Sequence, residues 1–158
     1  MYTLRDPAGA DMAGTLKQVA EMGYEGVELA GYGNLQVDTL QRALQDNNLK
    51  VVASHIGIDQ LKNSYDKVVE DNLLLNNKYI VVPFIGEEYR SREGYTKLAE
   101  ELNEFGARLN SAGFTLCYHN HDFEFERYDN EYGLDILYAN SNPDLVKIEL
   151  DSFWVKKG

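Results

Sequence analysis

The sequence predicts an α/β fold built on a parallel sheet, because two patterns alternate along the whole chain. Short apolar runs rich in β-branched residues alternate with longer stretches in which apolar residues recur every three or four positions. The short runs return at intervals of roughly 25–35 residues, which is the size of one βα unit. Strands connected by helices lie parallel, with right-handed crossovers. An open doubly wound sheet and most of a (β/α)8 barrel both fit this pattern.

Six strands are expected in all. Five are apolar runs, at residues 26–30, 50–54, 78–83, 114–119 and 145–150. The opening segment, MYTLRD, resembles the remaining part of a strand that began earlier, which gives about six βα units. No linker or low-complexity segment divides the 158 residues, so a single domain is expected over residues 1–158.

Five helices are expected between these strands. Four have an apolar stripe with helical spacing, and a shorter fifth precedes Asn142-Pro143; they cover residues 12–20, 37–44, 61–69, 98–109 and 132–140. Gly23 and Gly113 follow the first and fourth helices, where a left-handed residue ends a helix. Ser91 is the expected N-cap of the fourth helix.

The net charge of −11 excludes some classes of partner. An acidic surface repels nucleic acid and anionic lipid, so neither is expected as a partner. No apolar run approaches the roughly 20 residues needed to cross a bilayer, and the N-terminus has no signal segment. The single cysteine, Cys117, cannot form an internal disulfide, which predicts a cytoplasmic protein.

Polar side chains gather at the carboxyl ends of the expected strands. Strand alternation places Cys117, His119 and His121 on one face of TLCYHNH, opposite Leu116 and Tyr118. The same reasoning adds four further residues to the polar face, which are Glu28, His55, Glu149 and Asp151. Sites in parallel α/β folds form at this end of the sheet.

Charged groups that converge in such a place are costly unless they are paired or bind a metal. Imidazole and carboxylate ligands suit a transition metal better than calcium. A divalent metal (Mn, Zn, Co or Mg) is therefore the expected cofactor. The alternative is a polar loop whose histidines cap backbone groups.

Five segments carry a family resemblance. YTLRD, GYEGVELAGY, VVASHIG, YHNHDFEF and KIELDSFWVKKG resemble, in order and spacing, the sugar phosphate isomerase/epimerase family of xylose isomerase-like (β/α)8 TIM barrels. The resemblance covers essentially the whole chain, and YHNHDFEF followed by ELDxxW is specific for one subgroup. It implies a divalent metal at the carboxyl-terminal mouth, held by a carboxylate on strand five, an aspartate on six, a histidine on seven and a glutamate on eight.

The resemblance also implies roles for individual residues. Asp151 matches the strand-six aspartate, and Glu124 is the candidate carboxylate near strand five, with His119 and His121 as competitors. Glu28 and His55 match positions that face the sugar. Trp154 resembles a wall against the sugar or a packing aromatic, and Arg5 either contacts a polar substrate group or is an exposed arginine. His121 is also expected to contact substrate.

The length of the chain differs from a full barrel, which needs about 250 residues. The sequence is therefore expected to be a partial TIM barrel that lacks the last two strands, with their histidine and glutamate ligands. Its open edges predict either a homo-oligomer or completion of the barrel by another chain.

The expected function is metal-dependent isomerisation or epimerisation of a sugar or keto-sugar, by proton transfer next to a carbonyl. His119 and Glu149 are the candidate proton-transfer residues. The alternatives are a related 3-keto-sugar lyase or dehydratase, a non-catalytic fragment of such an enzyme, an endonuclease-type relative, and a nucleotide-binding open sheet. The acidic charge disfavours the endonuclease, and the lack of a Gly-rich phosphate loop disfavours the nucleotide-binding sheet.

Overall fold

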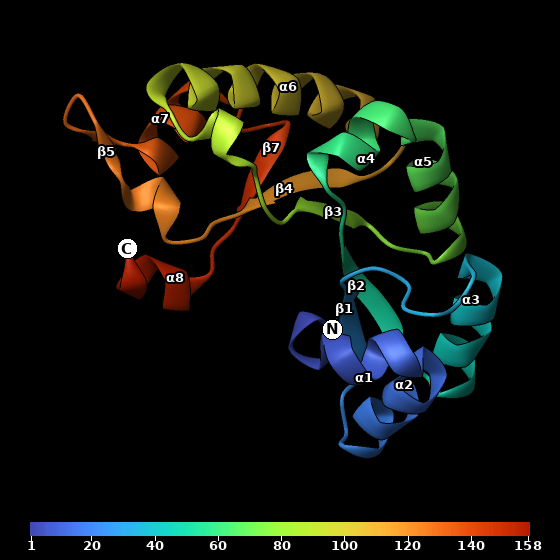
Figure 1. Cartoon of the computed structure of the whole chain (residues 1–158). Coiled ribbons are helices and arrows are strands. Elements are labelled where there is room, and N and C mark those ends of the chain that lie inside the picture. Colours follow the sequence, from blue (N-terminus) through green and yellow to red (C-terminus); the bar gives the residue numbers. More distant parts are fainter.

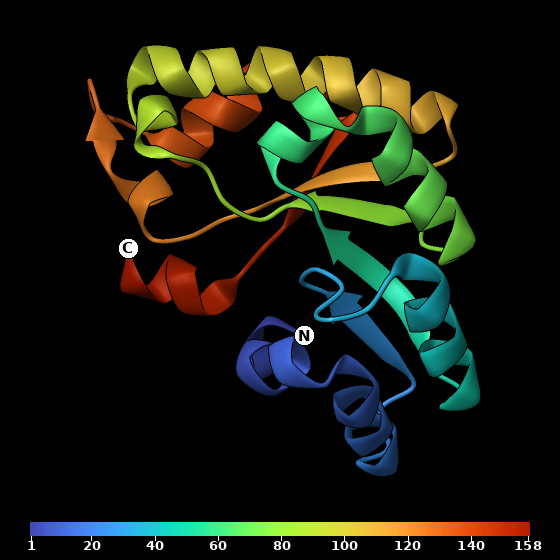
Figure 2. The same ribbon diagram turned by 45° about the vertical axis from the view of Figure 1, so that its right-hand side comes forward.

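Five strands form one parallel sheet in the computed structural model, which describes all 158 residues. Their order is β1-β2-β3-β4-β7, with bounds Gly26–Leu29, Lys50–His55, Tyr79–Val82, Thr115–His119 and Val146–Glu149. β1 and β7 are the two edges and do not pair with each other. Figures 1 and 2 show a curved sheet with helices along its convex side. The predicted parallel α/β architecture is confirmed.

The remaining elements are mostly helical. The helices are α1 (Arg5–Ala10), α2 (Met12–Glu21), α3 (Val37–Asp46), α4 (Ile58–Asn63), α5 (Tyr65–Leu74), α6 (Arg92–Ser111), α7 (Gly133–Asn140) and α8 (Ser152–Lys157). Single 3-10 turns are η1 (Tyr2–Leu4), η2 (Glu87–Tyr89) and η3 (Phe123–Phe125), and a small hairpin joins β5 (Arg127–Tyr128) to β6 (Glu131–Tyr132). None of the helices is long and apolar enough to cross a membrane.

The two faces of the sheet differ in the way that strand alternation predicts. Leu116 and Tyr118 of β4 are fully buried in the large core under α6 and α7. On the concave face, Cys117 packs in a separate small cluster with Ala53 and Val81. Polar side chains at the ends of the same strands therefore project into the concave side.

The prediction of a strand at residues 1–6 is wrong, because the chain there forms η1 and α1. Asp6 and Pro7 lie in the first turn of α1, where an acidic side chain is favourable and a missing N–H costs little. Asp11 then begins α2 as its N-cap, accepting a hydrogen bond from the Gly14 backbone N–H at 2.9 Å. The N-terminal amine of Met1 donates to the Glu28 carbonyl at 2.6 Å, which fixes the start of the chain beside β1.

The helix expected over residues 61–69 is divided into α4 and α5. The break is at Ser64, whose φ of −145° is not helical. Serine competes for backbone hydrogen bonds and so favours helix ends over helix interiors. This break turns α4 into a short helix that directly follows β2, next to the carboxyl ends of the strands.

Other local predictions are confirmed. Gly23 and Gly113 have φ of +92° and +89°, as left-handed residues after α2 and α6. Ser91 caps α6 by accepting a hydrogen bond from the Gly94 N–H at 3.0 Å. Only Val146 of β7 is buried. Ile148 and the next apolar residue after the strand, Leu150, are 49% and 57% exposed because β7 is an edge strand.

Candidate functional site

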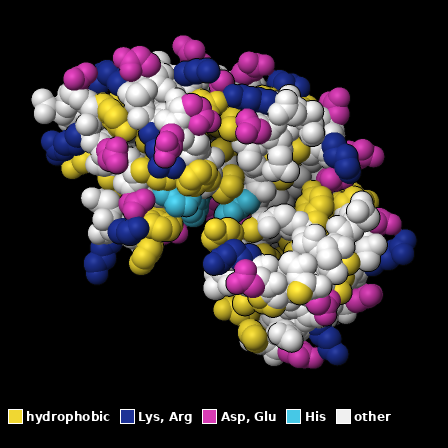
Figure 3. All heavy atoms as spheres, in the orientation of Figure 1, with side chains coloured by type: hydrophobic (Ala, Val, Ile, Leu, Met, Phe, Trp, Pro, Cys, Tyr) yellow, Lys and Arg dark blue, Asp and Glu magenta, His cyan; other side chains and the backbone are white.

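The candidate site lies where the parallel strands end. His55 is the last residue of β2, His119 the last of β4 and Glu149 the last of β7. His119 and Glu149 are also direct partners in the β4–β7 register. Because the strands are parallel, their terminal side chains meet at one edge of the sheet. Figure 3 shows histidine side chains in a hollow on this side of the molecule, with hydrophobic side chains beside them.

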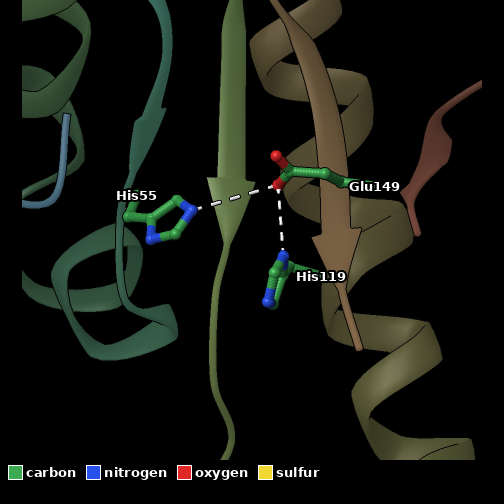
Figure 4. A group of neighbouring side chains, drawn as sticks. All are labelled: His55, His119 and Glu149. Carbon is green, nitrogen blue, oxygen red and sulfur yellow. Dashed lines mark ion pairs between the residues drawn. The ribbon is translucent and has the colours of Figure 1, made fainter. Parts of the chain in front are cut away.

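Three side chains, His55, His119 and Glu149, form a compact group, which we call the His-His-Glu group (Figure 4). Glu149 Oε2 lies 3.7 Å from His119 Nδ1 and 4.0 Å from His55 Nε2. One ligand atom from each residue lies within 4.8 Å of the other two. Ligand atoms bound at 2.0–2.2 Å to one ion are roughly 3–4 Å apart, so the group fits a single metal ion.

Each of these three ligand atoms is buried and lacks a hydrogen-bond partner. Buried polar atoms are almost always paired, and an unpaired one costs about 1–3 kcal/mol. Three such atoms facing one point indicate a site for a ligand that accepts electron pairs. Imidazole nitrogen and carboxylate oxygen are donors that suit divalent metals such as Mn, Zn and Co. The residues present therefore fit a divalent metal.

Glu28 of β1 lies next to this group. Its Oε1 is 3.2 Å from His55 Nε2, but the contact does not have hydrogen-bond geometry, and Oε1 is a fourth buried oxygen without a partner. Burial raises the pKa of Glu28, but interaction with His55 and Glu149 outweighs burial and lowers that pKa to about 2. Glu28 is therefore ionised at neutral pH.

His119 lies between two carboxylates. Its Nδ1 faces Glu149 and its Nε2 is 3.8 Å from Asp151 Oδ2. Interaction with Glu149 raises the pKa of His119, and burial partly offsets that increase. Both ring nitrogens of His119 are thus directed at acidic groups from β7 and the turn that follows it.

Asp151, the predicted strand-six ligand, connects β7 to α8. Its Oδ1 accepts hydrogen bonds from the backbone N–H groups of Phe153 and Trp154, at 2.9 and 3.1 Å, and so caps α8. Oδ2 is the oxygen that faces His119. One oxygen of Asp151 is therefore used by the fold and the other is directed at the site.

Glu124, the predicted strand-five ligand, is not brought into the His-His-Glu group. Its side chain is completely buried, with Oε1 accepting from the Tyr118 hydroxyl at 2.6 Å and Oε2 from the His121 N–H at 2.8 Å. Burial raises the pKa of Glu124, and these hydrogen bonds partly offset that increase. Both oxygens of Glu124 thus fix the loop after β4.

An aromatic wall lies beside the group. The His121 ring is 5.1 Å from the Trp154 ring and stacks on Phe123 at 5.5 Å with an angle of 4°. Phe84, which follows β3, contacts the edges of His121 and Phe123 and is half exposed. Burial, and then the charge of His119, lower the pKa of His121, which favours its neutral form.

A cavity of about 1190 Å³ includes most of the predicted site residues. Its lining contains Glu28, His55, His119, His121, Asp151 and Trp154. Arg5 is outside this lining: it is exposed, donates to the Tyr2 carbonyl at 3.2 Å and stacks on the Tyr2 ring. The sequence predictions missed Phe84 and Tyr32, which also line the cavity. The available signal for Phe84 was its position: it is a bulky apolar residue directly after Pro83, at the end of a strand.

Three solved structures are similar to this chain in fold. A sugar phosphate isomerase/epimerase from Parabacteroides distasonis matches with a TM-score of 0.86 at 22% identity, over 99% of this chain and 65% of its own. An AP endonuclease of family 2 from Brucella melitensis matches with a TM-score of 0.70 at 17% identity, over 89% of this chain and 63% of its own. A D-psicose 3-epimerase, determined in the presence of D-fructose, matches with a TM-score of 0.66 at 17% identity, over 93% and 60%.

The fold is that of an incomplete xylose isomerase-like TIM barrel, whose five parallel strands do not close into a ring. The resemblance found in the sequence is thus confirmed at the level of the fold, which is all that identities below 25% show. The chain spans about 65% of the length of the sugar phosphate isomerase/epimerase structure from Parabacteroides distasonis. No protein-family model and no curated protein matches the sequence.

Proposed function

We propose that this chain carries the metal site of a divalent-metal-dependent isomerase or epimerase acting on a sugar or keto-sugar. The observation that supports this proposal is the His-His-Glu group, whose three ligand atoms are buried, close together and without hydrogen-bond partners. His55, His119 and Glu149 would hold the ion, which we propose to be Mn, Zn, Co or Mg. When bound, such an ion polarises carbonyl and hydroxyl oxygens of a sugar and stabilises developing negative charge.

The reaction that fits these residues is proton transfer at a carbon next to a carbonyl. The C–H bond breaks and its proton moves to a carboxylate oxygen. Return of a proton to the other face of the same carbon gives an epimer. Return of the proton to the former carbonyl carbon, with the hydroxyl proton passing from the neighbouring oxygen to the former carbonyl oxygen, gives an isomer. We propose Glu28 and the free Oδ2 of Asp151 for these transfers, because they flank the His-His-Glu group from β1 and from the β7–α8 turn.

This proposal changes the predicted roles of six residues, including Glu28 and His55, which were expected to face the sugar. The sequence suggested that His119 and Glu149 transfer protons and that Glu124 and Asp151 bind the metal. The buried unpaired atoms of His119 and Glu149 favour metal binding, and the two hydrogen bonds of Glu124 favour a structural role. Asp151 retains an oxygen directed at the site, which this proposal assigns to proton transfer.

The cavity wall supports a sugar as the ligand class. Trp154 and His121 present aromatic surface next to polar groups, an arrangement that suits the apolar face and the hydroxyl groups of a sugar. The similar D-psicose 3-epimerase structure was determined with D-fructose, so keto-hexoses are the first substrates to test.

Nucleic acid is a poor alternative ligand despite the likeness to an endonuclease structure. The net charge is −11, and Lys67 is the only lysine or arginine that lines the cavity. Lys67 is moreover paired with Asp71 at 2.7 Å. Binding to phosphate backbones requires several uncompensated cations. We also retain the cytoplasm as the proposed compartment, because Cys117 is a free, buried thiol.

Two measurements on the purified chain test the proposal. Calorimetric titration with Mn²⁺ or Co²⁺ should give one equivalent of bound metal. Glu149→Gln removes a charged ligand, so it should weaken binding by more than the about 10–100-fold typical of residues that only orient ligands. Glu104→Gln, which changes an exposed glutamate on α6, is the matched control and should bind normally. In D₂O, the metal-loaded chain should exchange hydrogen for deuterium next to the carbonyl of D-fructose or another keto-hexose, as followed by NMR.

Each outcome decides part of the proposal. Failure of the chain to bind any of the four metals, or equal binding by Glu149→Gln, would reject the metal site. Stoichiometric metal binding without exchange into any keto-hexose would reject the isomerase or epimerase function and favour a non-catalytic metal-binding piece.

A further inference from the structure

We propose that Asn120 is a positioning residue that holds the candidate ligand His119 in place against the segment carrying Glu149 and Asp151. This inference rests on the proposed metal site. Asn120 lies between two residues that face the cavity, yet its own side chain is completely buried. Because alternate residues project to opposite sides of an extended segment, Asn120 faces away from the cavity.

The amide of Asn120 binds both backbone groups of a single distant residue. Its Oδ1 accepts a hydrogen bond from the Asp151 N–H at 2.9 Å, and its Nδ2 donates to the Asp151 carbonyl at 3.3 Å. Nδ2 also donates to the His121 carbonyl at 3.4 Å. A side-chain amide offers a donor and an acceptor side by side, so it can form this reciprocal pair where a carboxylate cannot.

The position of this pair explains what it does. The last backbone register pair between β4 and β7 is His119 with Glu149, after which the two strands separate. The Asn120 amide therefore replaces the next step of strand pairing. It holds the ends of β4 and β7 together at the point where the His-His-Glu group and Asp151 are located.

The residue before Asn120, His119, contacts acidic side chains on both sides of its ring. On one side His119 Nδ1 is 3.7 Å from Glu149 Oε2, and on the other His119 Nε2 is 3.8 Å from Asp151 Oδ2. A shift of the β7–α8 turn would change both distances. Residues that orient metal ligands without touching the metal typically change affinity by about 10–100-fold when they are replaced.

The test compares two buried asparagines by the same substitution. Asn120→Asp keeps the shape and the acceptor but loses the donor, and it places a carboxylate oxygen against the carbonyls of Asp151 and His121. Asn72→Asp is the matched control, because Asn72 is also completely buried and bonds the Val68 carbonyl and Asn77, but on α5. The readouts are the Co²⁺ dissociation constant, the visible absorption bands of bound Co²⁺ and the thermal melting of each metal-free variant.

Asn120→Asp should weaken Co²⁺ binding about 10-fold or more and change the absorption bands, while Asn72→Asp lowers the melting temperature and leaves both metal readouts unchanged. Equal Co²⁺ affinity and equal spectra for Asn120→Asp and the unaltered chain would overturn the inference and leave the proposed metal site intact. Equal losses in both variants would also overturn it, because they would show a general effect of stability. If the unaltered chain bound no Co²⁺ and no other of the proposed metals, the proposed function would fail and this inference with it.

A measurement on the unaltered chain covers the case in which Asn120→Asp does not fold. The Asp151 backbone N–H should exchange slowly with D₂O in NMR spectra, because it is bonded to a buried amide. Addition of Zn²⁺, which is diamagnetic, should slow that exchange further. Fast exchange, as in an open turn, or exchange that is insensitive to bound metal, would overturn the inference.

Discussion

Replacement of Glu124 by glutamine should destabilise the fold without removing the metal site. The carboxylate accepts hydrogen bonds from Tyr118 and from the His121 N–H in a fully buried position. A hydrogen bond to a charged group contributes about 1.5–3 kcal/mol. The glutamine oxygen can keep one donor, and the Tyr118 hydroxyl can rotate to accept from the new amide. Both hydrogen bonds then remain but become neutral, so the expected loss in free energy of unfolding is the difference between two charged and two neutral hydrogen bonds, about 1.5–3 kcal/mol in all.

Urea denaturation measures this loss in free energy of unfolding directly. Thermal unfolding is a second measurement: for a chain of this length, the melting temperature should fall by about 3–12 °C, at about 2–4 °C per kcal/mol. Tyr118→Phe removes the other partner, and the double variant should show coupling of about 0.5–3 kcal/mol, since the two groups are in contact. Glu126→Gln, an exposed glutamate two residues further on, is the control and should change stability by less than about 0.5 kcal/mol.

Metal titration of the same variants completes the test. Residues that hydrogen-bond to metal ligands typically change metal affinity by about 10-fold or more when they are replaced. Glu124 bonds none of the three proposed ligands. The Co²⁺ affinity of Glu124→Gln should therefore change by less than about threefold. A large loss of Co²⁺ binding with an unchanged free energy of unfolding would refute this reasoning. It would show that Glu124 is a ligand, as the family resemblance in the sequence implied.

Three further predictions concern other parts of the chain. Lys62 and Tyr89 bind Glu101 at 2.8 and 2.6 Å; burial raises the pKa of Glu101, but these contacts outweigh burial and lower it. The stability from Glu101 is thus present above its unfolded pKa, about 4.3, and is lost as pH falls through the lower folded pKa. Glu101→Gln should flatten the acid side of the stability curve, whereas Glu100→Gln, an exposed neighbour, should not; an unchanged acid side in Glu101→Gln would disprove the linkage. Trp154→Ala should raise KM for the sugar about 3- to 10-fold with little change in kcat, as expected for loss of a stacking surface. Phe153 lies outside the cavity, so Phe153→Ala should leave KM unchanged. A KM effect confined to Phe153→Ala would contradict the placement of Trp154 in the aromatic wall. Asn130 has φ of +72° in the β5–β6 turn, so Asn130→Ala should cost about 1 kcal/mol in urea denaturation and Asn130→Gly should not; equal stability of the two variants would show that the turn is not strained.

The parts of the site that the sequence predicted are those that depend on strand alternation. His55, His119 and Glu149 end their strands, and Glu28 lies within β1, so period-two geometry alone directs them to one face and one edge. The structure brings them within 3.2–4.0 Å of a neighbouring member of this set. The sequence could not assign their roles, because alternation fixes where a side chain points but not which partners it finds.

The residues that the sequence placed less well lie outside regular strands. Glu124 belongs to a 3-10 turn, where no period relates position in the chain to direction in space. Arg5 was expected at a strand end, but residues 2–10 are helical and carry it to the exposed surface. The β5–β6 hairpin was also missed. Asp129 and Asn130, residue types that favour a type I′ turn, both adopt positive φ there.

Crystals of the chain soaked in Co²⁺ would test the central claim most directly, through the anomalous difference density of the metal. The account predicts one peak about 2.0–2.3 Å from His55 Nε2, His119 Nδ1 and an oxygen of Glu149. A peak held by Glu124, or full occupancy at a position that none of these three residues contacts, would contradict it.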